Sequence, residues 1–263
     1  MWTRETAIAY LNDTYQTLRS QTDLSPDNEI VTHRLHDLVA TLGDWHRAGF
    51  GADLADDPAL AAAHANLPPI CAAAEHELEK WWCRKALASD IPEDVLAGFW
   101  YLPNYLSLCN AEAALAGHDA LREAVFLGCG ALPMTAILFA RCDEHARLAC
   151  IDADAEACKL AECLVHRLHL EQRIAIHNGR AEECNAPPAA TVICASLLDA
   201  PGLYDHLAAC GISRLLVRDV EGVYRWLYRP ADLPGPEFRQ RARTAMSPER
   251  INITRYFAAD HLE

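Results

Sequence analysis

A glycine-rich loop followed by an acidic residue is the pattern in this chain best suited to binding a nucleoside. The apolar run AVFLG ends at Gly128, Gly130 follows, and Asp152 ends the next apolar run, 24 residues after Gly128. Glycines let a strand-to-helix turn approach a ligand closely, and N–H groups of the helix's first turn then face that ligand. An acid at the end of the second strand can accept hydrogen bonds from both ribose hydroxyls. The pattern therefore predicts a nucleoside site.

The loop departs from a dinucleotide fingerprint at the third glycine position, which Pro133 occupies. A third glycine permits close packing of helix on sheet, whereas proline fixes φ for the first turn of a helix. We therefore expect Gly128, Gly130, Leu132 and Pro133 to bind a ligand without a pyrophosphate, and S-adenosylmethionine (SAM) fits that description. The alternative is a plain strand-to-helix turn in which Asp152 only caps a helix.

Other polar groups in the same half extend the predicted site. Asp154 either contacts the nucleoside or caps the next helix. Gly179, Arg180 and Ala181 follow a third apolar run, and we expect them against the adenine edge. Arg218 lies near the end of the run SRLLVRD, and its fork suits a carboxylate of the acceptor or of the methionine part of SAM. A surface ion pair is the alternative for Arg218.

Two helical segments earlier in the chain carry polar groups at helical spacing. In ICAAAEHELEKWW, Glu75 and Glu79 lie four residues apart and share a face. In GFWYLPNYLSLCNAE, Tyr101 and Tyr105 are also four apart, although Pro103 favours a helix that starts after Tyr101. The alternative is a surface carboxylate pair with tyrosines at a packing interface.

The predicted secondary structure changes near residue 120, from helices alone to strands that alternate with helices. Before it, apolar residues recur at helical spacing, and LSPDNEIVTHRLHDLVATLG predicts a helix with Ser25 as its cap, Pro26 in first position and Gly43 at its end. Residues 48–69 have the composition of a long connection with a short helical piece.

From residue 124, strand-like runs alternate with amphipathic helices, which predicts an α/β fold with a parallel sheet and helices on both faces. Residues 229–250 are rich in proline and charge and are expected to form a loop before the last strand. We therefore expect an N-terminal helical bundle domain at residues 1–120, covering the active site, and a C-terminal Rossmann-like SAM-binding domain at residues 121–263.

Composition excludes several classes of protein. A net charge of −14 argues against a nucleic-acid partner, and no apolar run approaches a membrane span. The N-terminus is too polar for a signal peptide, so we expect a cytoplasmic protein. Eleven cysteines without a C-x-x-C pair, and histidines without a ligand cluster, favour buried thiols and no metal.

Several segments together resemble the nicotianamine synthase family. LSPDNEIVTHRLHDLV, AEHELE, FWYLPNYLSL with its following AE, FLGCGALPMTAILFA and IDADAEA look like the family's signatures in the right order. LLVRDVEGVYRWLYRP is similar to the family's arginine-led strand that returns to a leucine–tyrosine pair. The resemblance covers about residues 23–230, and G-x-G-x-L-P-[LM]-T is its most specific element.

The resemblance implies transfer of the 3-amino-3-carboxypropyl (2-aminobutanoyl) arm of SAM to an amine, with release of methylthioadenosine. Short bacterial members transfer one arm to histidine on the way to opine metallophores, and the short chain favours that activity. Family correspondence implies that Glu75 holds and deprotonates the amine with Tyr101 beside it, while Tyr105, Glu79 and Arg218 contact the substrate.

Departures from the plant pattern at Ala73, Trp100 and Pro103 argue against iterative nicotianamine synthesis. The resemblance further implies a downstream opine dehydrogenase that uses the product. The residues leave open a small-molecule SAM-dependent methyltransferase, a nicotianamine synthase acting on SAM itself, and a non-catalytic SAM- or metal-binding module. They also leave open L- or D-histidine as acceptor, and a homodimer or another assembly.

Overall fold

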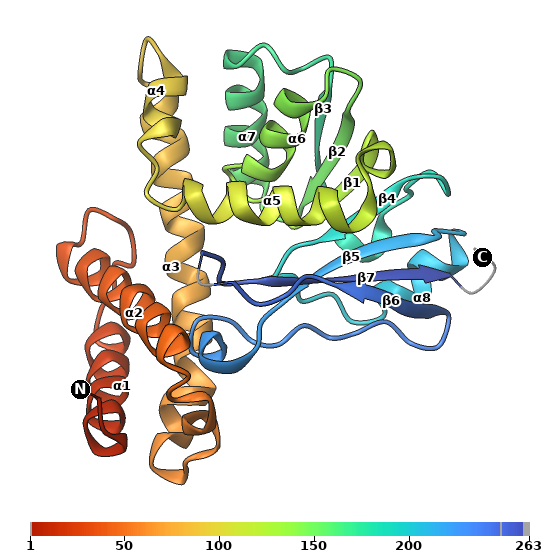
Figure 1. Cartoon of the computed structure of the whole chain (residues 1–263). Coiled ribbons are helices and arrows are strands. Elements are labelled where there is room, and N and C mark those ends of the chain that lie inside the picture. The colour runs from red at the N-terminus through yellow and green to blue at the C-terminus, as the bar shows by residue number, and fades with distance from the viewer. Residues whose placement is uncertain (1, 248, 260–263) are drawn as a thin grey trace. The chain divides into compact units, whose positions relative to one another are not determined.

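The computed structural model describes residues 2–247 and 249–259, and the chain packs as two compact units (Figure 1). The first unit comprises Met1–Trp81 with Val220–Pro230, and the second comprises Trp82–Asp219 with Ala231–Glu263. The boundary between the units does not separate helices from strands. The helices up to residue 116 are divided between the two units.

The first unit is built from helices around an apolar core that includes Leu38, Leu42 and Trp45. The N-cap of α2 is Asn28, whose side chain accepts a hydrogen bond from the Ile30 N–H. The predicted cap at Ser25 is therefore wrong, because the Asn28 carboxamide oxygen supplies the acceptor three residues later. The elements are α1 (Arg4–Arg19), α2 (Glu29–Ala48), η1 (Ala52–Asp56), η2 (Pro58–Leu60), the part of α3 (Ala61–Leu87) up to Trp81, and η5 (Gly222–Trp226).

The end of α2 also differs from the prediction. The helix continues through Gly43, which is buried, and stops at Gly49 with φ +63°. Glycine tolerates this left-handed conformation, which closes the last turn of a helix. Burial of Leu38, Leu42 and Trp45 along one face outweighs the low helix propensity of a single internal glycine.

Helix α3 (Ala61–Leu87) runs through Pro68 and Pro69, where the composition predicted a connection. Proline removes a backbone hydrogen bond inside a helix and normally bends or ends it. Here the buried residues Ala63, Leu67 and Cys71 keep helical spacing across the prolines. Their packing overrides the local signal, so that prediction is wrong.

The second unit contains a seven-stranded sheet in the order β3-β2-β1-β4-β5-β7-β6. The first five strands along that order pair in parallel, whereas β7 is antiparallel to both β5 and β6. The strands are β1 (Glu123–Leu127), β2 (Arg147–Asp152), β3 (Ile174–Asn178), β4 (Thr191–Cys194), β5 (Arg214–Asp219), β6 (Phe238–Arg243) and β7 (Ile253–Ala259). The helical elements are the end of α3, α4 (Pro92–Ala97), α5 (Leu102–Ala116), η3 (His118–Leu121), α6 (Met134–Cys142), α7 (Ala155–Arg167), η4 (Ala181–Glu183) and α8 (Leu203–Ala209).

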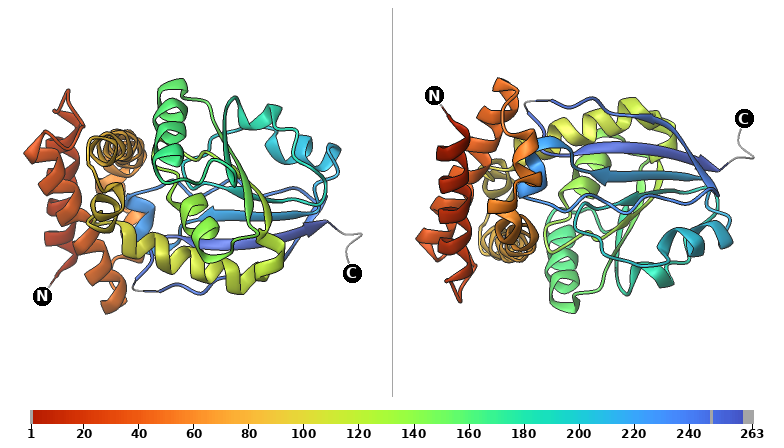
Figure 2. Two further views of the ribbon diagram at one scale, coloured as in Figure 1. Left: turned by 90° about the horizontal axis from the view of Figure 1, so that it is seen from above. Right: turned by 90° about the horizontal axis from the view of Figure 1, so that it is seen from below.

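Both faces of the sheet are covered, as predicted (Figure 2). Val125 and Val217 point into a core shared with Leu203 and Leu207 of α8. Phe126 faces the opposite side, where its ring lies under the guanidinium of Arg218, which is hydrogen-bonded to Glu112 of α5. This alternation follows from the two-residue period of strands.

Strand β6 was not predicted, because its sequence FRQRAR looked like part of a charged loop. It lies at the edge of the sheet, where only one neighbour needs to be paired and exposed charges are tolerated. In the part of the chain that the structure describes, no helix combines the length and apolarity needed to cross a bilayer.

Candidate functional site

The predicted nucleoside loop lies at the carboxyl ends of β1 and β2. Gly128 and Gly130 have φ +75° and +64°, conformations that glycine adopts without strain. The Gly130 N–H donates to Asp152 Oδ2 at 2.8 Å, and the Asp154 N–H donates to Asp152 Oδ1 at 2.9 Å. A Cβ on Gly128 would approach the Ala195 Cβ to 3.1 Å, so the loop is packed closely against the segment after β4.

Asp152 fits a role in holding a nucleoside. It is half-buried, and each of its two oxygens accepts one backbone hydrogen bond in the structure. A carboxylate oxygen has two lone pairs, so each oxygen can accept another hydrogen from a vicinal diol. The same side chain therefore shapes the glycine loop and keeps acceptor capacity beside it.

The other predicted nucleoside residues lie around this edge with different exposures. Leu132 is buried, and Pro133 is the residue before α6 rather than part of its first turn. Asp154 caps α7 by accepting from two backbone N–H groups, which confirms the capping alternative. A contact between the nucleoside and Leu132, Pro133 or Asp154 remains a prediction.

The third strand brings Gly179 next to Asp152. The Gly179 N–H donates to the Asp152 carbonyl at 3.0 Å. Arg180 is exposed and pairs with Glu182 at 2.6 Å, while Ala181 is buried at the start of η4. Gly179, the residue after β3, is therefore the predicted adenine-edge residue whose backbone contacts Asp152.

In the first unit, Glu75 on α3 accepts a hydrogen bond from the Tyr228 hydroxyl at 2.6 Å. Burial raises the pKa of Glu75 to about 7, and the hydrogen bond from Tyr228 opposes that rise. Tyr228 itself is buried, whereas Glu75 keeps some exposure. Glu75 is therefore a carboxylate that can exchange a proton near neutral pH.

Glu79 lies one turn after Glu75 on the same helix and is half-buried. In the second unit, Tyr101 immediately precedes α5 and Tyr105 lies in its first turn, which confirms the expected helix start after Tyr101. Their rings are 5.7 Å apart in an edge-to-face arrangement, and both are buried. The roles of all three residues in substrate binding stay predictions.

Arg218 is neither at the surface nor free for a carboxylate ligand at its Nε and Nη2 atoms. These atoms donate to Glu112 Oε1 and Oε2 at 2.8 and 2.9 Å, and Nη2 also donates to Thr135 Oγ1. Thr254 Oγ1 donates to Glu112 Oε1 at 2.9 Å. Because Glu112 is fully buried, this bidentate pair ties α5 to the sheet, and the surface ion-pair alternative is wrong.

Sequence reasoning missed the hydrogen-bond partners of two predicted site residues, Glu75 and Arg218. Tyr228 follows η5 at a distance of 153 residues from Glu75, so no local spacing joins them. Glu112 lies on the same helix as Tyr105, and its partner Arg218 is 106 residues away. The leucine–tyrosine pair at the end of LLVRDVEGVYRWLYRP was the available signal for Tyr228.

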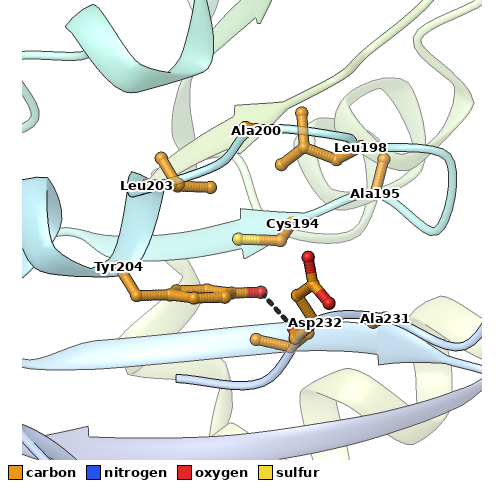
Figure 3. Close-up of a pocket in the computed structure, with 9 residues that line it drawn as sticks. Cys194, Ala195, Leu198, Ala200, Leu203, Tyr204, Ala231 and Asp232 are labelled. Carbon is orange, nitrogen blue, oxygen red and sulfur yellow. Dashed lines mark hydrogen bonds between the residues drawn. The ribbon is translucent and has the colours of Figure 1, made fainter. Parts of the chain in front are cut away.

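A small cavity near the end of β4 is too small for either substrate (Figure 3). Its volume is about 20 Å³, and the Tyr204 hydroxyl beside it donates to the Asp232 carbonyl at 2.9 Å. A cavity of that size holds about one water molecule. Cys194, Ala195, Leu198, Ala200, Leu203, Val217 and Ala231 complete its lining.

Cysteines and histidines form no metal site in the described residues. No group of three or more histidine, cysteine or acidic side chains there could hold an ion. All eleven thiols are free, and burial raises the pKa of Cys71 and Cys194 to about 12. These two side chains are protonated thiols packed as small apolar groups.

Sequence comparisons match this chain to one family. The profile of the family described as nicotianamine synthase protein matches residues 3–192. L-histidine 2-aminobutanoyltransferase of Pseudomonas aeruginosa (strain UCBPP-PA14) is 36% identical over 147 residues, which cover 56% of this chain and 53% of that protein. The chain thus spans about half the length of the curated relative that it matches.

Solved structures share the fold over almost the whole chain. A mutant of MtNAS in complex with S-adenosylmethionine has a TM-score of 0.82 at 18% identity, covering 96% of this chain and 98% of that chain. MtNAS in complex with MTA and tNA has a TM-score of 0.81 at 18% identity, covering 98% and 99%. The predicted α/β, Rossmann-like fold with a preceding helical part is confirmed.

Proposed function

Because this chain belongs to the nicotianamine synthase family, we propose that it transfers the 2-aminobutanoyl arm of SAM to the α-amine of L-histidine. The observation that carries the proposal is Glu75, a carboxyl group with a pKa of about 7, hydrogen-bonded by a buried tyrosine. The name of the Pseudomonas aeruginosa relative supports histidine as the acceptor.

Glu75 supplies the proton acceptor that this reaction needs. An α-amine is mostly protonated at neutral pH and must lose a proton before its lone pair can attack carbon. SAM supplies a sulfonium whose γ-carbon receives the amine lone pair, while the C–S bonding electrons leave with methylthioadenosine. Glu75 takes the proton, and Tyr228 holds the carboxylate in place.

Residues at the carboxyl edge of the sheet hold the nucleoside in this proposal. Asp152 accepts from the ribose hydroxyls, and Gly128 and Gly130 allow close approach of the backbone. Gly179, Arg180 and Ala181 lie toward the adenine. Tyr101, Tyr105 and Glu79 contact the acceptor, without a metal ion in the reaction.

The proposal includes a cellular setting. We place the reaction in the cytoplasm, with an opine dehydrogenase using its product and a homodimer as the assembly. The substituted amino acid that forms carries a new primary amine, which a reductive condensation with a keto acid can use.

Product analysis with SAM and a panel of amino acids tests this function. We expect methylthioadenosine together with a histidine adduct heavier by one aminobutanoyl arm. S-adenosylhomocysteine would show a methyltransferase, and nicotianamine formed together with methylthioadenosine without an added acceptor would show synthesis from SAM itself. Glu75→Gln should abolish turnover and keep SAM binding, with Glu77→Gln as the matched control. Wild-type turnover in Glu75→Gln would contradict the role of Glu75.

A further inference from the structure

Two arginines are buried in the described part of the chain, and they differ in what their guanidinium groups contact. Arg218 is engaged by Glu112 and Thr135. Arg250 is 8% exposed, and its Nη2 donates to the Ala245 carbonyl at 2.7 Å. Nη1 of Arg250 is buried and has no hydrogen-bond partner among the described residues.

Arg250 lies at the edge of the sheet that carries the glycine loop and Asp152. Its N–H donates to the Ser247 carbonyl at 3.1 Å, which closes a turn. Three residues later Ile253 pairs with Asp219, the last residue of β5. Because β5 is parallel to β4, β1 and β2, this turn lies beyond the carboxyl ends of those strands.

The residues after Arg250 are fastened to neighbouring elements. The Ile251 N–H donates to Asn104 Oδ1 on α5 at 3.0 Å. Asn252 Nδ2 donates to Ser196 Oγ, two residues after β4, at 2.8 Å. Arg250 is therefore held on a fixed segment next to the start of α5 and to the segment that follows β4.

A buried guanidinium nitrogen without a partner is costly. An unsatisfied buried donor loses its hydrogen bonds to water without replacement, and the loss is larger when the group is charged. Burial lowers the pKa of Arg250, while the charges of Glu112 and Glu249 oppose this, and an arginine remains protonated in proteins. Oε1 of Glu112 already accepts from Arg218 and Thr254, and Oε2 accepts from Arg218. A ligand that brings its own negative charge would satisfy Nη1.

We propose that Arg250 binds an α-carboxylate of an amino-acid group at the carboxyl edge of the sheet. The inference rests on the proposed function, which supplies two such groups, the acceptor and the methionine part of SAM. Arginine suits this task because its planar fork matches a carboxylate. It takes the role that the sequence suggested for Arg218, whose fork is occupied by Glu112.

Calorimetric titration of two ligand pairs tests the proposal. The first pair is SAM and decarboxylated SAM, and the second is histidine and histidinamide titrated in the presence of methylthioadenosine. Wild-type protein should bind the carboxylate member of one pair roughly 10- to 100-fold more tightly, the range expected for a charge-assisted hydrogen bond. Arg250→Met should remove that preference without weakening the ligand that lacks the carboxylate. The pair that responds identifies the source of the carboxylate.

Arg239→Met is the matched control, because Arg239 is an exposed arginine of the same unit. Arg250→Lys keeps the charge without the fork and should retain part of the preference, which also serves if Arg250→Met does not fold. An undiminished carboxylate preference in either Arg250 variant overturns the proposal, as does its absence in the wild type.

These measurements distinguish failure of the role proposed for Arg250 from failure of the proposed transferase function. Carboxylate-dependent binding through Arg250 without release of methylthioadenosine would keep the role of Arg250 and reject the proposed function. If the wild type releases methylthioadenosine and Arg250→Met keeps the same carboxylate preference, the proposed function stands and the role of Arg250 is rejected. A wild-type protein that binds neither SAM nor histidine overturns both.

Discussion

At the scale of single residues, Glu75 is subject to two opposing influences. Burial raises its pKa to about 7, and the hydrogen bond from Tyr228 lowers it. Tyr228→Phe removes only the second influence, so the pKa of Glu75 should rise further. The acid limb of the pH–rate profile should move to higher pH, with a loss of activity at pH 7 that is largely recovered at pH 9.

Release of methylthioadenosine followed across that pH range measures the shift. Tyr204→Phe is the control, since Tyr204 is a largely buried tyrosine whose hydroxyl donates to a backbone carbonyl elsewhere. An acid limb at the same pH in wild type and Tyr228→Phe would show that Glu75 does not limit the rate.

Glu75 also links stability to pH. Its folded-state pKa of about 7 exceeds its ordinary value of 4.5, so the folded state binds more protons between these values. The free energy of unfolding should therefore fall as pH rises from 4.5 to 7, by up to about 3 kcal/mol. Glu75→Gln has no carboxyl group to titrate at this position, so its free energy of unfolding should exceed that of the wild type above pH 7. Urea unfolding of both proteins at pH 5 and pH 8 measures the difference, and parallel pH dependences would contradict it.

The sequence could predict those site residues that lie close together along the chain. Gly128, Gly130 and Asp152 belong to one β-α-β segment, and the structure joins them as expected. The contact of Glu75 with Tyr228 and the burial of Arg250 depend on segments far apart in sequence. No periodicity or spacing encodes such contacts.

At the scale of elements, the buried pair Glu112–Arg218 fastens α5 to the sheet. Removing one partner leaves an uncompensated buried charge, which typically costs 3–5 kcal/mol. Glu112→Leu should therefore destabilise the protein strongly. The double variant Glu112→Leu with Arg218→Met should recover most of the loss, because apolar groups of similar volume can replace a buried pair. Denaturant unfolding of the single and double variants checks this, and additive losses would contradict it.

Element prediction succeeded where burial and local propensity agree. Four of the six residues of strand β2 are apolar, and the strand ends at Asp152, where the sequence predicted the end of an apolar run. The first nine residues of α3 were missed because tertiary packing keeps two prolines helical, and strand β6 was missed because an edge position keeps a charged segment extended. In both cases contacts with residues far away in the sequence decide the conformation and override the local propensity.

At the scale of the whole molecule, the net charge of −14 should influence how SAM arrives. SAM carries a sulfonium and an ammonium against one carboxylate, so the long-range field of an acidic protein attracts it. Raising the salt concentration from 50 to 500 mM shortens the Debye length from roughly 14 Å to about 4 Å and should slow association several-fold. Stopped-flow binding measures the rate, with methylthioadenosine as the control because it lacks a net charge and should show little change. Equal salt dependence for the two ligands would show that the overall charge does not steer SAM, and that only contacts within the site select it.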